Sequence, residues 1–155
     1  MNNVRIREAR HADSGHWLVL RNALWPDSAA DHGVDIRDYF DRGSASVHQC
    51  FLAMRDNQAI GLIELTIRHY AEGSHADRVP YVEGWIVAEE HRGQGVGRAL
   101  MAQAERWAQS QGYSELASDA EVDNAGSIRA HHRLGFSETE RIVCFLKKLN
   151  PDGAS

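Results

Sequence analysis

The sequence has few cysteines and no long apolar run, and each absence excludes a class of protein. Cys50 and Cys144 are the only cysteines among 155 residues, without a C-x-x-C pair. This excludes a disulfide-stapled secreted scaffold and predicts two reduced cysteines in the core. Residues 1–20 lack the apolar stretch of a signal peptide, and no later run approaches the roughly 20 apolar residues of a membrane-spanning helix. We therefore expect a cytoplasmic protein that does not associate with membranes.

Basic residues are also in deficit. Lys and Arg number 17 against 22 Asp and Glu, which gives a formal net charge of −5 with His neutral. This balance argues against a nucleic-acid partner held by phosphate contacts and permits a cationic partner. The length and the 43% of hydrophobic residues predict one soluble domain over residues 1–150, with residues 151–155 as a flexible tail.

Hydrophobic periodicity predicts an α/β or α+β sheet protein, because strands alternate with helices in the second half of the chain. That alternation also predicts some parallel pairing. The expected strands cover residues 4–7, 50–54, 59–70, 81–87, 116–118 and 141–148. The expected helices run from an N-cap at Asp13 to Trp25 before Pro26, and over residues 35–42, 95–111 and 125–134. Residues 27–33 and 71–79 are expected to be loops, and residues 56–58 a hairpin turn.

The strongest local signal is the glycine-rich passage Arg92-Gly93-Gln94-Gly95-Val96-Gly97, between a strand and the longest helix. Without Cβ atoms the backbone can offer its N–H groups to an anion, and the helix N-terminus adds positive partial charge. Arg92 and Arg98 can add charge-assisted contacts. Arg98 occupies the last glycine position of a Rossmann motif, and a P-loop would need a Lys-Ser/Thr pair. We expect the passage to bind a pyrophosphate; a glycine-rich turn without a ligand is the alternative.

These residues resemble the R/Q-x-x-G-x-G/A motif with which the GNAT superfamily of acyl-CoA-dependent N-acyltransferases holds the CoA pyrophosphate. A second segment is similar to the superfamily's N-x-x-A-x-x-x-Y-x-x-x-G-F pattern, at Asn124, Ser127, His131, Gly135 and Phe136. The resemblance implies a GNAT fold, a mixed central sheet flanked by helices in the order β-α-α-β-β-β-α-β-α-β. It also implies acetyl-CoA as cosubstrate and no metal. His131 stands where many members carry a tyrosine that protonates the departing thiolate.

Five further segments resemble one branch of the bacterial aminoglycoside 6′-N-acetyltransferases, at residues 24–27, 67–70, 82–85, 117–119 and 134–141. In that branch a histidine at the place of His131 is usual. The resemblance implies that the aminoglycoside contacts Trp25, Tyr70, Glu83, Asp119 and Glu140. It implies that acetyl-CoA is held by Trp85, Ile86, Val87, Arg92, Gly93, Gln94, Gly95, Val96, Gly97 and Asn124. It further implies a homodimer that exchanges its C-terminal strand.

The residues themselves leave alternatives open at the carboxylates. Strand alternation places Tyr81, Glu83, Trp85 and Val87 on one face, so Glu83 lies among large apolar side chains and needs a cationic partner. That partner is either a bound ammonium group or one of the protein's own arginines. Asp119 follows a short strand, where open sheets place ligands, although Asp is also a turn former there.

Three other positions also have two interpretations. Trp25 ends a helix stripe and can be a core residue. Tyr70 begins a loop, where exposed aromatic residues bind more often than they pack. Glu140 enters the last expected strand in a charge-rich stretch, which is typical of a solvated face.

The resemblance implies transfer of acetyl from acetyl-CoA to the 6′ amine of an aminoglycoside. Asp119 is then the expected general base, and Glu83 and Glu140 orient ammonium groups. Backbone N–H groups near Ile86 and Val87, where family members have an interrupted strand, would meet the developing oxyanion. Two alternatives remain: a GNAT enzyme that acetylates another small amine or a protein N-terminus, and a non-catalytic acyl-CoA-binding module.

Overall fold

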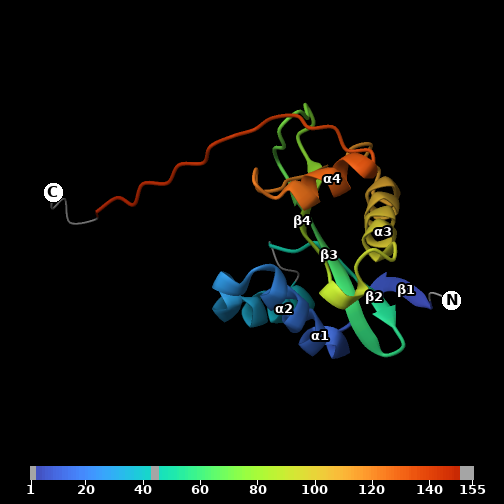
Figure 1. Ribbon diagram of the computed structural model, residues 1–155. Coiled ribbons are helices and arrows are strands. Elements are labelled where there is room, and N and C mark those ends of the chain that lie inside the picture. Colours follow the sequence, from blue (N-terminus) through green and yellow to red (C-terminus); the bar gives the residue numbers. More distant parts are fainter. Residues whose placement is uncertain (1–2, 43–45, 151–155) are drawn as a thin grey trace. The chain divides into compact units, whose positions relative to one another are not determined.

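The first unit is built on a five-stranded sheet whose strands follow one another in chain order (Figure 1). The structure is a computed structural model that describes residues 3–42 and 46–150, and the chain divides into two units, residues 1–120 and 121–155. The strands are β1 (Val4–Glu8), β2 (Gln49–Arg55), β3 (Gln58–Arg68), β4 (Val79–Val87) and β5 (Ala117–Ser118). Neighbours from β1 to β4 are antiparallel, while β5 runs parallel to β4. The expected mixed sheet is confirmed; the single domain over residues 1–150 stays a prediction, and the tail at 151–155 lies outside the described residues.

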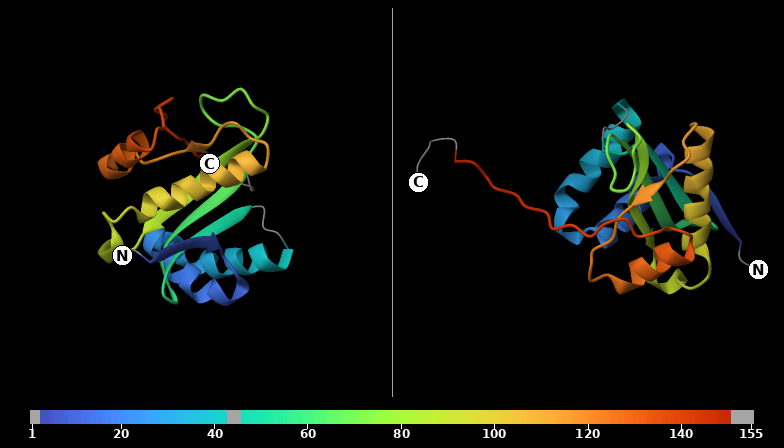
Figure 2. Two further views of the ribbon diagram at one scale, coloured as in Figure 1. Left: turned by 90° about the vertical axis from the view of Figure 1, so that its right-hand side faces the viewer. Right: turned by 90° about the horizontal axis from the view of Figure 1, so that it is seen from above.

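Helices cover both faces of this sheet. The two N-terminal helices pack on one face and α3 packs on the other (Figure 2). The described part of the second unit, residues 121–150, contains one helix. The helices are α1 (Ser14–Leu24), α2 (Ala29–Arg42), α3 (Val96–Ser110) and α4 (Ala125–Arg133), with short 3₁₀ turns at η1 (His11–Asp13), η2 (Pro26–Ser28) and η3 (Glu89–His91). Within the described ranges, no helix is long and apolar enough to cross a bilayer.

The start of α1 is fixed by Asp13, at the predicted N-cap position but through different contacts. Its carboxylate accepts hydrogen bonds from the Arg7 guanidinium at 2.7 and 2.9 Å and from the Arg10 backbone N–H at 2.7 Å. No side-chain bond to the first turn of α1 is formed. The bond from Arg7 holds the pKa of Asp13 below its usual value. Asp13 therefore ties β1 to the entry of α1 instead of capping the helix.

The second helix is longer than its local sequence suggests. It begins at Ala29, so the loop expected over residues 27–33 is wrong apart from the 3₁₀ turn η2. His32 is buried, and its Nε2 lies 2.9 Å from the carbonyl oxygen of Trp25. Burial of this side chain stabilises helical backbone where His32 and Gly33 have weak helical propensity.

A bulge divides β4 at Glu83. Leu65 of β3 is opposite Val82 and Glu64 is opposite Gly84, so Glu83 is the extra residue. Beyond it the side chains exchange faces: the Trp85 indole lies against α3, where its N–H donates to the carbonyl of Gly97 at 3.1 Å. The expected alternation of Tyr81, Glu83, Trp85 and Val87 on one face is therefore wrong after Glu83.

The C-terminal segment forms none of the strand expected at residues 141–148. Residues 136–150 have no regular secondary structure, and Phe145 is 92% exposed. A strand requires a partner for its backbone N–H and C=O groups, and alternating apolar residues alone do not supply one. Cys144 is exposed in consequence, which corrects its expected core position, whereas Cys50 is fully buried as expected.

A buried ion pair lies at the centre of the α1–β3 interface. Glu64 is 0% exposed, accepts a hydrogen bond from the Trp17 indole N–H at 3.1 Å, and lies 3.0 Å from Nε of Arg21. Arg21 also donates to Asp35 of α2 at 2.8 Å. Burial raises the pKa of Glu64, and the charge of Arg21 opposes that shift. Both helices are thereby joined to the central strand of the sheet.

We expect Glu64→Ala to lower the free energy of unfolding by about 3–5 kcal/mol, because it removes the fully buried partner of the Arg21 guanidinium and leaves only the partly exposed Asp35. Urea titration followed by tryptophan fluorescence measures this change. Glu90→Ala, which removes an exposed carboxylate from η3, is the matched control and should change the value by less than about 0.5 kcal/mol. Equal midpoints for the two variants would contradict the assigned role of the pair.

Candidate functional site

The glycine passage after β4 has the backbone that anion binding requires. Gly93 and Gly95 adopt φ angles of +75° and +83°, in the left-handed region that favours glycine. Gly95 is the N-cap of α3 and, as a glycine, has no side chain that could cap the N–H groups of the first turn. Those N–H groups and the helix dipole are the elements that bind pyrophosphates elsewhere.

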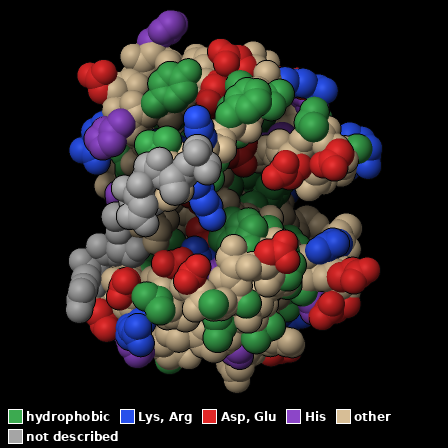
Figure 3. All heavy atoms as spheres, turned by 90° about the vertical axis from the view of Figure 1, so that its left-hand side faces the viewer, with side chains coloured by type: hydrophobic (Ala, Val, Ile, Leu, Met, Phe, Trp, Pro, Cys, Tyr) green, Lys and Arg blue, Asp and Glu red, His purple; other side chains and the backbone are tan. Residues whose placement is uncertain are grey.

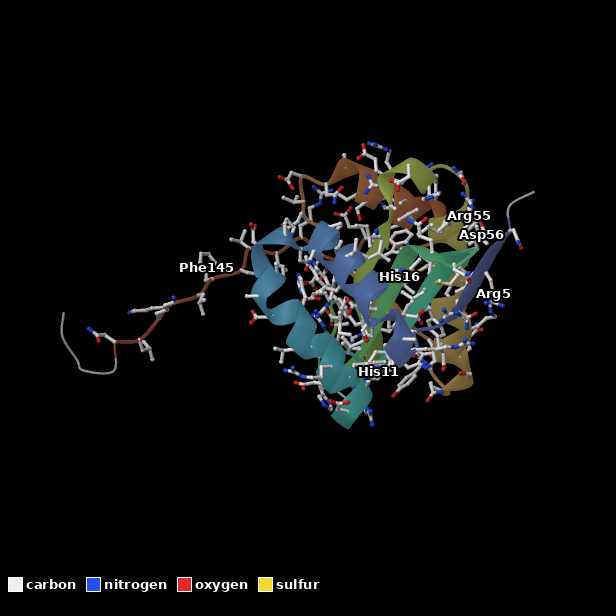
Figure 4. The ribbon with its side chains drawn as sticks, turned by 90° about the horizontal axis from the view of Figure 1, so that it is seen from below. Arg5, His11, His16, Arg55, Asp56 and Phe145 are labelled. Carbon is white, nitrogen blue, oxygen red and sulfur yellow. The ribbon has the colours of Figure 1, made fainter. Side chains whose placement is uncertain are left out.

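Arg55 holds this passage from the end of β2, next to Asp56 of the hairpin turn (Figure 4). One guanidinium nitrogen lies 2.9 Å from Nδ1 of His91, and the other donates to Oε1 of Gln94 at 2.9 Å. Arg92 contributes a third tether, since its Nε donates to the carbonyl of Val87 at 2.9 Å. Sequence reasoning missed Arg55, because a charged residue before a turn carries no signal of a contact made almost forty positions later.

The Trp85 side chain extends from β4 and packs against the first turn of α3. Besides the hydrogen bond to the carbonyl of Gly97, its ring would lie 3.3 Å from a Cβ added at that glycine. Glycine at position 97 thus lets the helix approach the indole closely. The predicted contacts of Trp85 and of residues 92–97 with acetyl-CoA stay predictions.

The far edge of β4 is open beyond Val82. Within the described residues, β5 pairs only with Tyr81 and Val82. The N–H of Ala88 donates to the carbonyl of Ile60 at 2.8 Å, so alternate residues of β4, including Ile86, direct their backbone groups to β3. Val87 directs its groups to the open edge, as its bond with Arg92 also indicates. Of the two predicted oxyanion donors, the geometry therefore favours Val87.

Glu83 and Asp119 are brought together by a continuous cluster on the α1 face of β4. Glu83 accepts hydrogen bonds from Arg68 at 2.7 and 2.8 Å and from the Thr66 hydroxyl at 2.7 Å. The guanidinium carbon of Arg68 lies 3.6 Å from the centre of the Tyr81 ring. Tyr81 in turn donates its phenolic O–H to Oδ2 of Asp119 at 2.9 Å. The cationic partner of Glu83 in this structure is thus the protein's own arginine.

Electrostatics fixes the protonation states within this cluster. Burial would raise the pKa of Glu83, but the hydrogen bonds from Arg68 and Thr66 outweigh it and hold the pKa below its usual value. Burial and the bond to Asp119 raise the pKa of Tyr81. Tyr81 therefore remains a hydrogen-bond donor at neutral pH and Glu83 remains ionised.

Trp25 lies beside this cluster, across β4 from α3. A Cβ added at Gly84 would come within 2.8 Å of the Trp25 ring, so the indole packs directly on the bulge. The Arg21 guanidinium lies 5.3 Å from the ring centre. Tyr70 follows the end of β3 and is 64% exposed. The structure thus places Trp25 next to Glu83 and leaves the Tyr70 ring in solvent.

The second unit carries the remaining predicted residues. Asn124 is the N-cap of α4, and its side-chain oxygen accepts from the Ser127 N–H at 3.1 Å. Nδ1 of His131 lies 2.7 Å from the Ser127 carbonyl oxygen, and its ring packs against Phe136. Glu140 is exposed. The predicted contacts of Asn124 with acetyl-CoA and of Glu140 with the aminoglycoside stay predictions.

Acidic side chains are scattered over the face drawn in Figure 3, with Lys and Arg side chains between them. Among residues 3–42 and 46–150, no three His, Cys, Asp or Glu side chains are grouped in a way that could hold a metal ion. The Glu83–Asp119 cluster is thus distinguished by its connections and not by a surplus of acid.

Comparisons with known proteins agree with this geometry. Residues 15–136 match the model of the acetyltransferase (GNAT) family. An aminoglycoside N(6′)-acetyltransferase type 1 of Klebsiella aerogenes is 38% identical over 146 residues, covering 93% of this chain and 96% of that protein. One from Acinetobacter haemolyticus is 40% identical over 148 residues, covering 95% and 100%.

Solved structures extend the similarity to the whole fold. The apo crystal structure of an aminoglycoside antibiotic 6′-N-acetyltransferase from Acinetobacter haemolyticus has a TM-score of 0.84 and 40% identity, covering 94% of this chain and 99% of that one. A complex of the enzyme AAC(6′)-Iy with a bisubstrate analogue, CoA-S-monomethyl-acetylneamine, has a TM-score of 0.86 and 34% identity, covering 96% and 100%.

Because Arg68 opposes the effect of burial, we expect Arg68→Gln to raise the pKa of Glu83. Titration of the side-chain carboxyl ¹³C resonance of Glu83 measures the shift. Arg78→Gln removes an exposed arginine outside the cluster and should leave this resonance unchanged. An unaltered Glu83 titration in Arg68→Gln would show that the ion pair does not persist in solution.

Proposed function

The chain belongs to the acetyltransferase (GNAT) family, and we infer from this that it transfers the acetyl group of acetyl-CoA to the 6′ amine of aminoglycosides. The observation that carries this assignment is the match to N(6′)-acetyltransferases along nearly the whole length of both chains. Acetylation of that amine removes a positive charge from the antibiotic, which is the chemistry of a resistance enzyme.

Acetyl-CoA is the cosubstrate, and the glycine passage fits its pyrophosphate. We propose that the N–H groups of residues 93–97 hold the pyrophosphate, with Arg92 nearby and Arg55 keeping the passage in place. The open edge of β4 then takes the acyl end, with the Val87 N–H directed at the thioester oxygen. Trp85, Ile86 and Asn124 are the other residues that we propose to contact acetyl-CoA.

The reaction is attack of an amine on a thioester. The substrate amine is protonated at neutral pH and must lose a proton before its nitrogen can bond to the carbonyl carbon. We propose that Asp119 accepts that proton through Oδ1, since Tyr81 holds Oδ2. The tetrahedral oxyanion is stabilised by the Val87 N–H. As it collapses, the carbon–sulfur bond breaks and the attacking nitrogen loses its extra proton; transfer of that proton to the departing thiolate leaves a neutral amide and CoA as a thiol. Trp25, Tyr70, Glu83 and Glu140 are proposed to position the remaining rings and ammonium groups.

Thiol release in the presence of kanamycin and of an aminoglycoside with a 6′-hydroxyl tests the assignment. We expect release only with the 6′-amine. Release with both compounds would place the acetylated amine elsewhere, and release only with unrelated amines would favour a different GNAT substrate. Acetyl-CoA binding without thiol release for any amine would favour the non-catalytic module.

Asp119→Asn should lower kcat for kanamycin by about 10²-fold or more, because the amide cannot accept the ammonium proton. The affinity for acetyl-CoA, measured by calorimetry, should change little. Asp77→Asn, in the loop before β4, is the matched control and should retain the parent kcat. A parent-like kcat in Asp119→Asn would remove Asp119 from the role of general base.

We further propose that the enzyme is a homodimer formed through the C-terminal segment. Residues 141–149 carry strand-forming apolar side chains, and Val143, Phe145, Leu146 and Leu149 are each more than three-quarters exposed in the single chain. Addition of this segment to the sheet of a second copy would pair its backbone and bury these side chains. The cytoplasm is the proposed location, since both cysteines are free thiols and acetyl-CoA is a cytoplasmic metabolite.

Phe145→Glu should convert the dimer to a monomer, because a carboxylate at the centre of the exchanged segment would be buried without a partner. Sedimentation velocity at micromolar concentration measures the change. Lys147→Glu alters the charge of the same segment at an exposed polar position and should preserve the dimer. A parent protein that sediments as a monomer would refute the proposed dimer.

A further inference from the structure

The carboxylate assigned to the substrate's ammonium groups already has a cation. Among the described residues, the hydrogen-bond partners of Glu83 come from β3: the forked guanidinium of Arg68 on both oxygens and the Thr66 hydroxyl on one. The parallel pair of N–H···O bonds from Arg68 is the geometry that gives strong carboxylate binding. These three bonds take most of the acceptor sites of the carboxylate, so an ammonium group that pairs with Glu83 competes with Arg68 for its charge.

Arg68 also interacts with the other two side chains of the cluster, Tyr81 and Asp119. Its guanidinium stacks on the Tyr81 ring at 3.6 Å, and the Tyr81 hydroxyl is bonded to Asp119. The charge of Asp119 acts on Arg68 in the same direction as that of Glu83, and both raise the pKa of Arg68. A carboxylate, an aromatic face and a second carboxylate are the features that recognise an alkylammonium ion.

Arg21 and Arg68, two of the paired arginines of the first unit, differ in how firmly they are held. Arg21 is 7% exposed and lies between Glu64 and Asp35, so it cannot leave without abandoning a buried charge. Arg68 is 42% exposed at the last residue of β3, and water can replace its contacts with Glu83. Solvent screening weakens this pair despite its forked geometry, because both side chains are partly exposed, and a ligand with several charges can therefore compete with it.

We propose that Arg68 is an internal competitor for the substrate's ammonium groups, and that it selects polycationic amines over singly charged ones. This inference rests on the proposed function. Exchange of the Arg68 guanidinium for one ammonium group at Glu83 contributes little binding free energy. An amine with a single charge is therefore disfavoured. A polycation can displace Arg68, because its other ammonium groups pair with further carboxylates. The free energy of those pairs offsets the loss of the Arg68–Glu83 pair. Arg68 is in this sense a specificity-determining residue that does not take part in proton transfer.

The test compares kanamycin with 6-amino-6-deoxyglucose, which carries the same kind of primary amine on one ring and no other charge. In Arg68→Gln the KM for kanamycin should fall about two- to five-fold, the range expected when a partly exposed pair no longer competes. The kcat should stay within about two-fold of the parent value, because the base is untouched. The ratio of kcat/KM for kanamycin to that for the aminosugar should fall, since the singly charged amine gains more.

Arg78→Gln removes the same formal charge at an exposed position outside the cluster and controls for general electrostatic attraction. It should leave the selectivity ratio unchanged. In the background of Glu83→Gln, adding Arg68→Gln should no longer lower the KM, because the two residues compete through one carboxylate. Arg68→Lys retains the charge without the fork and should give a KM between those of Arg68→Gln and the parent.

A higher KM for kanamycin in Arg68→Gln, with an unchanged melting temperature, would overturn the proposal and make Arg68 a positioning residue for Glu83. Equal selectivity ratios for Arg68→Gln and Arg78→Gln would also overturn it. Failure of the proposed function would be seen separately, as the absence of thiol release by the parent enzyme with kanamycin.

Discussion

The extra residue at Glu83 in β4 is the constraint on which the site depends. Without it, Glu83, Trp85 and Val87 would share one face of the sheet. With it, Glu83 stays with Tyr81 on the face covered by α1, and Trp85 turns to support α3. A single strand thus carries the cluster proposed to bind the cationic substrate on one face, and on the other it supports the helix proposed to bind the anionic cosubstrate. Gly84 permits the bulge to lie against Trp25, because no Cβ fits there.

The sequence predicts most elements of the fold because their signals are local. The long stripe of α3, the hairpin turn after β2 and the stop before Pro26 all depend on residues near one another in the chain. The first turns of α2 depend on burial of His32, and the strand expected at 141–148 depends on a pairing partner. Neither condition is visible in local periodicity, so both were predicted wrongly.

In the candidate site, too, some features have local signals in the sequence and others depend on the whole fold. Glycines at 93 and 95 have a conformational requirement that spacing reveals, and their positive φ angles confirm the expected backbone. The partners of the acidic residues do not follow from spacing, because Arg68 reaches Glu83 only through the register of β3 and β4. Reasoning from the residues left ammonium and arginine as equal alternatives for Glu83. Sheet register, which is a property of the whole fold, decides between them for the protein without its substrate.

The β2–β3 hairpin turn has an unusual importance for a surface turn. Asp56 adopts a φ of +55°, rare for a residue with a side chain, and Arg55 immediately before it reaches both His91 and Gln94. Most exposed turns tolerate insertions, because nothing depends on where their flanking residues point. Here one inserted residue would rotate Arg55 away from His91 and Gln94, so the length of this turn determines how the glycine passage is held. With that passage as the proposed site of the cosubstrate pyrophosphate, hairpin length is a property of cosubstrate binding as much as of the sheet.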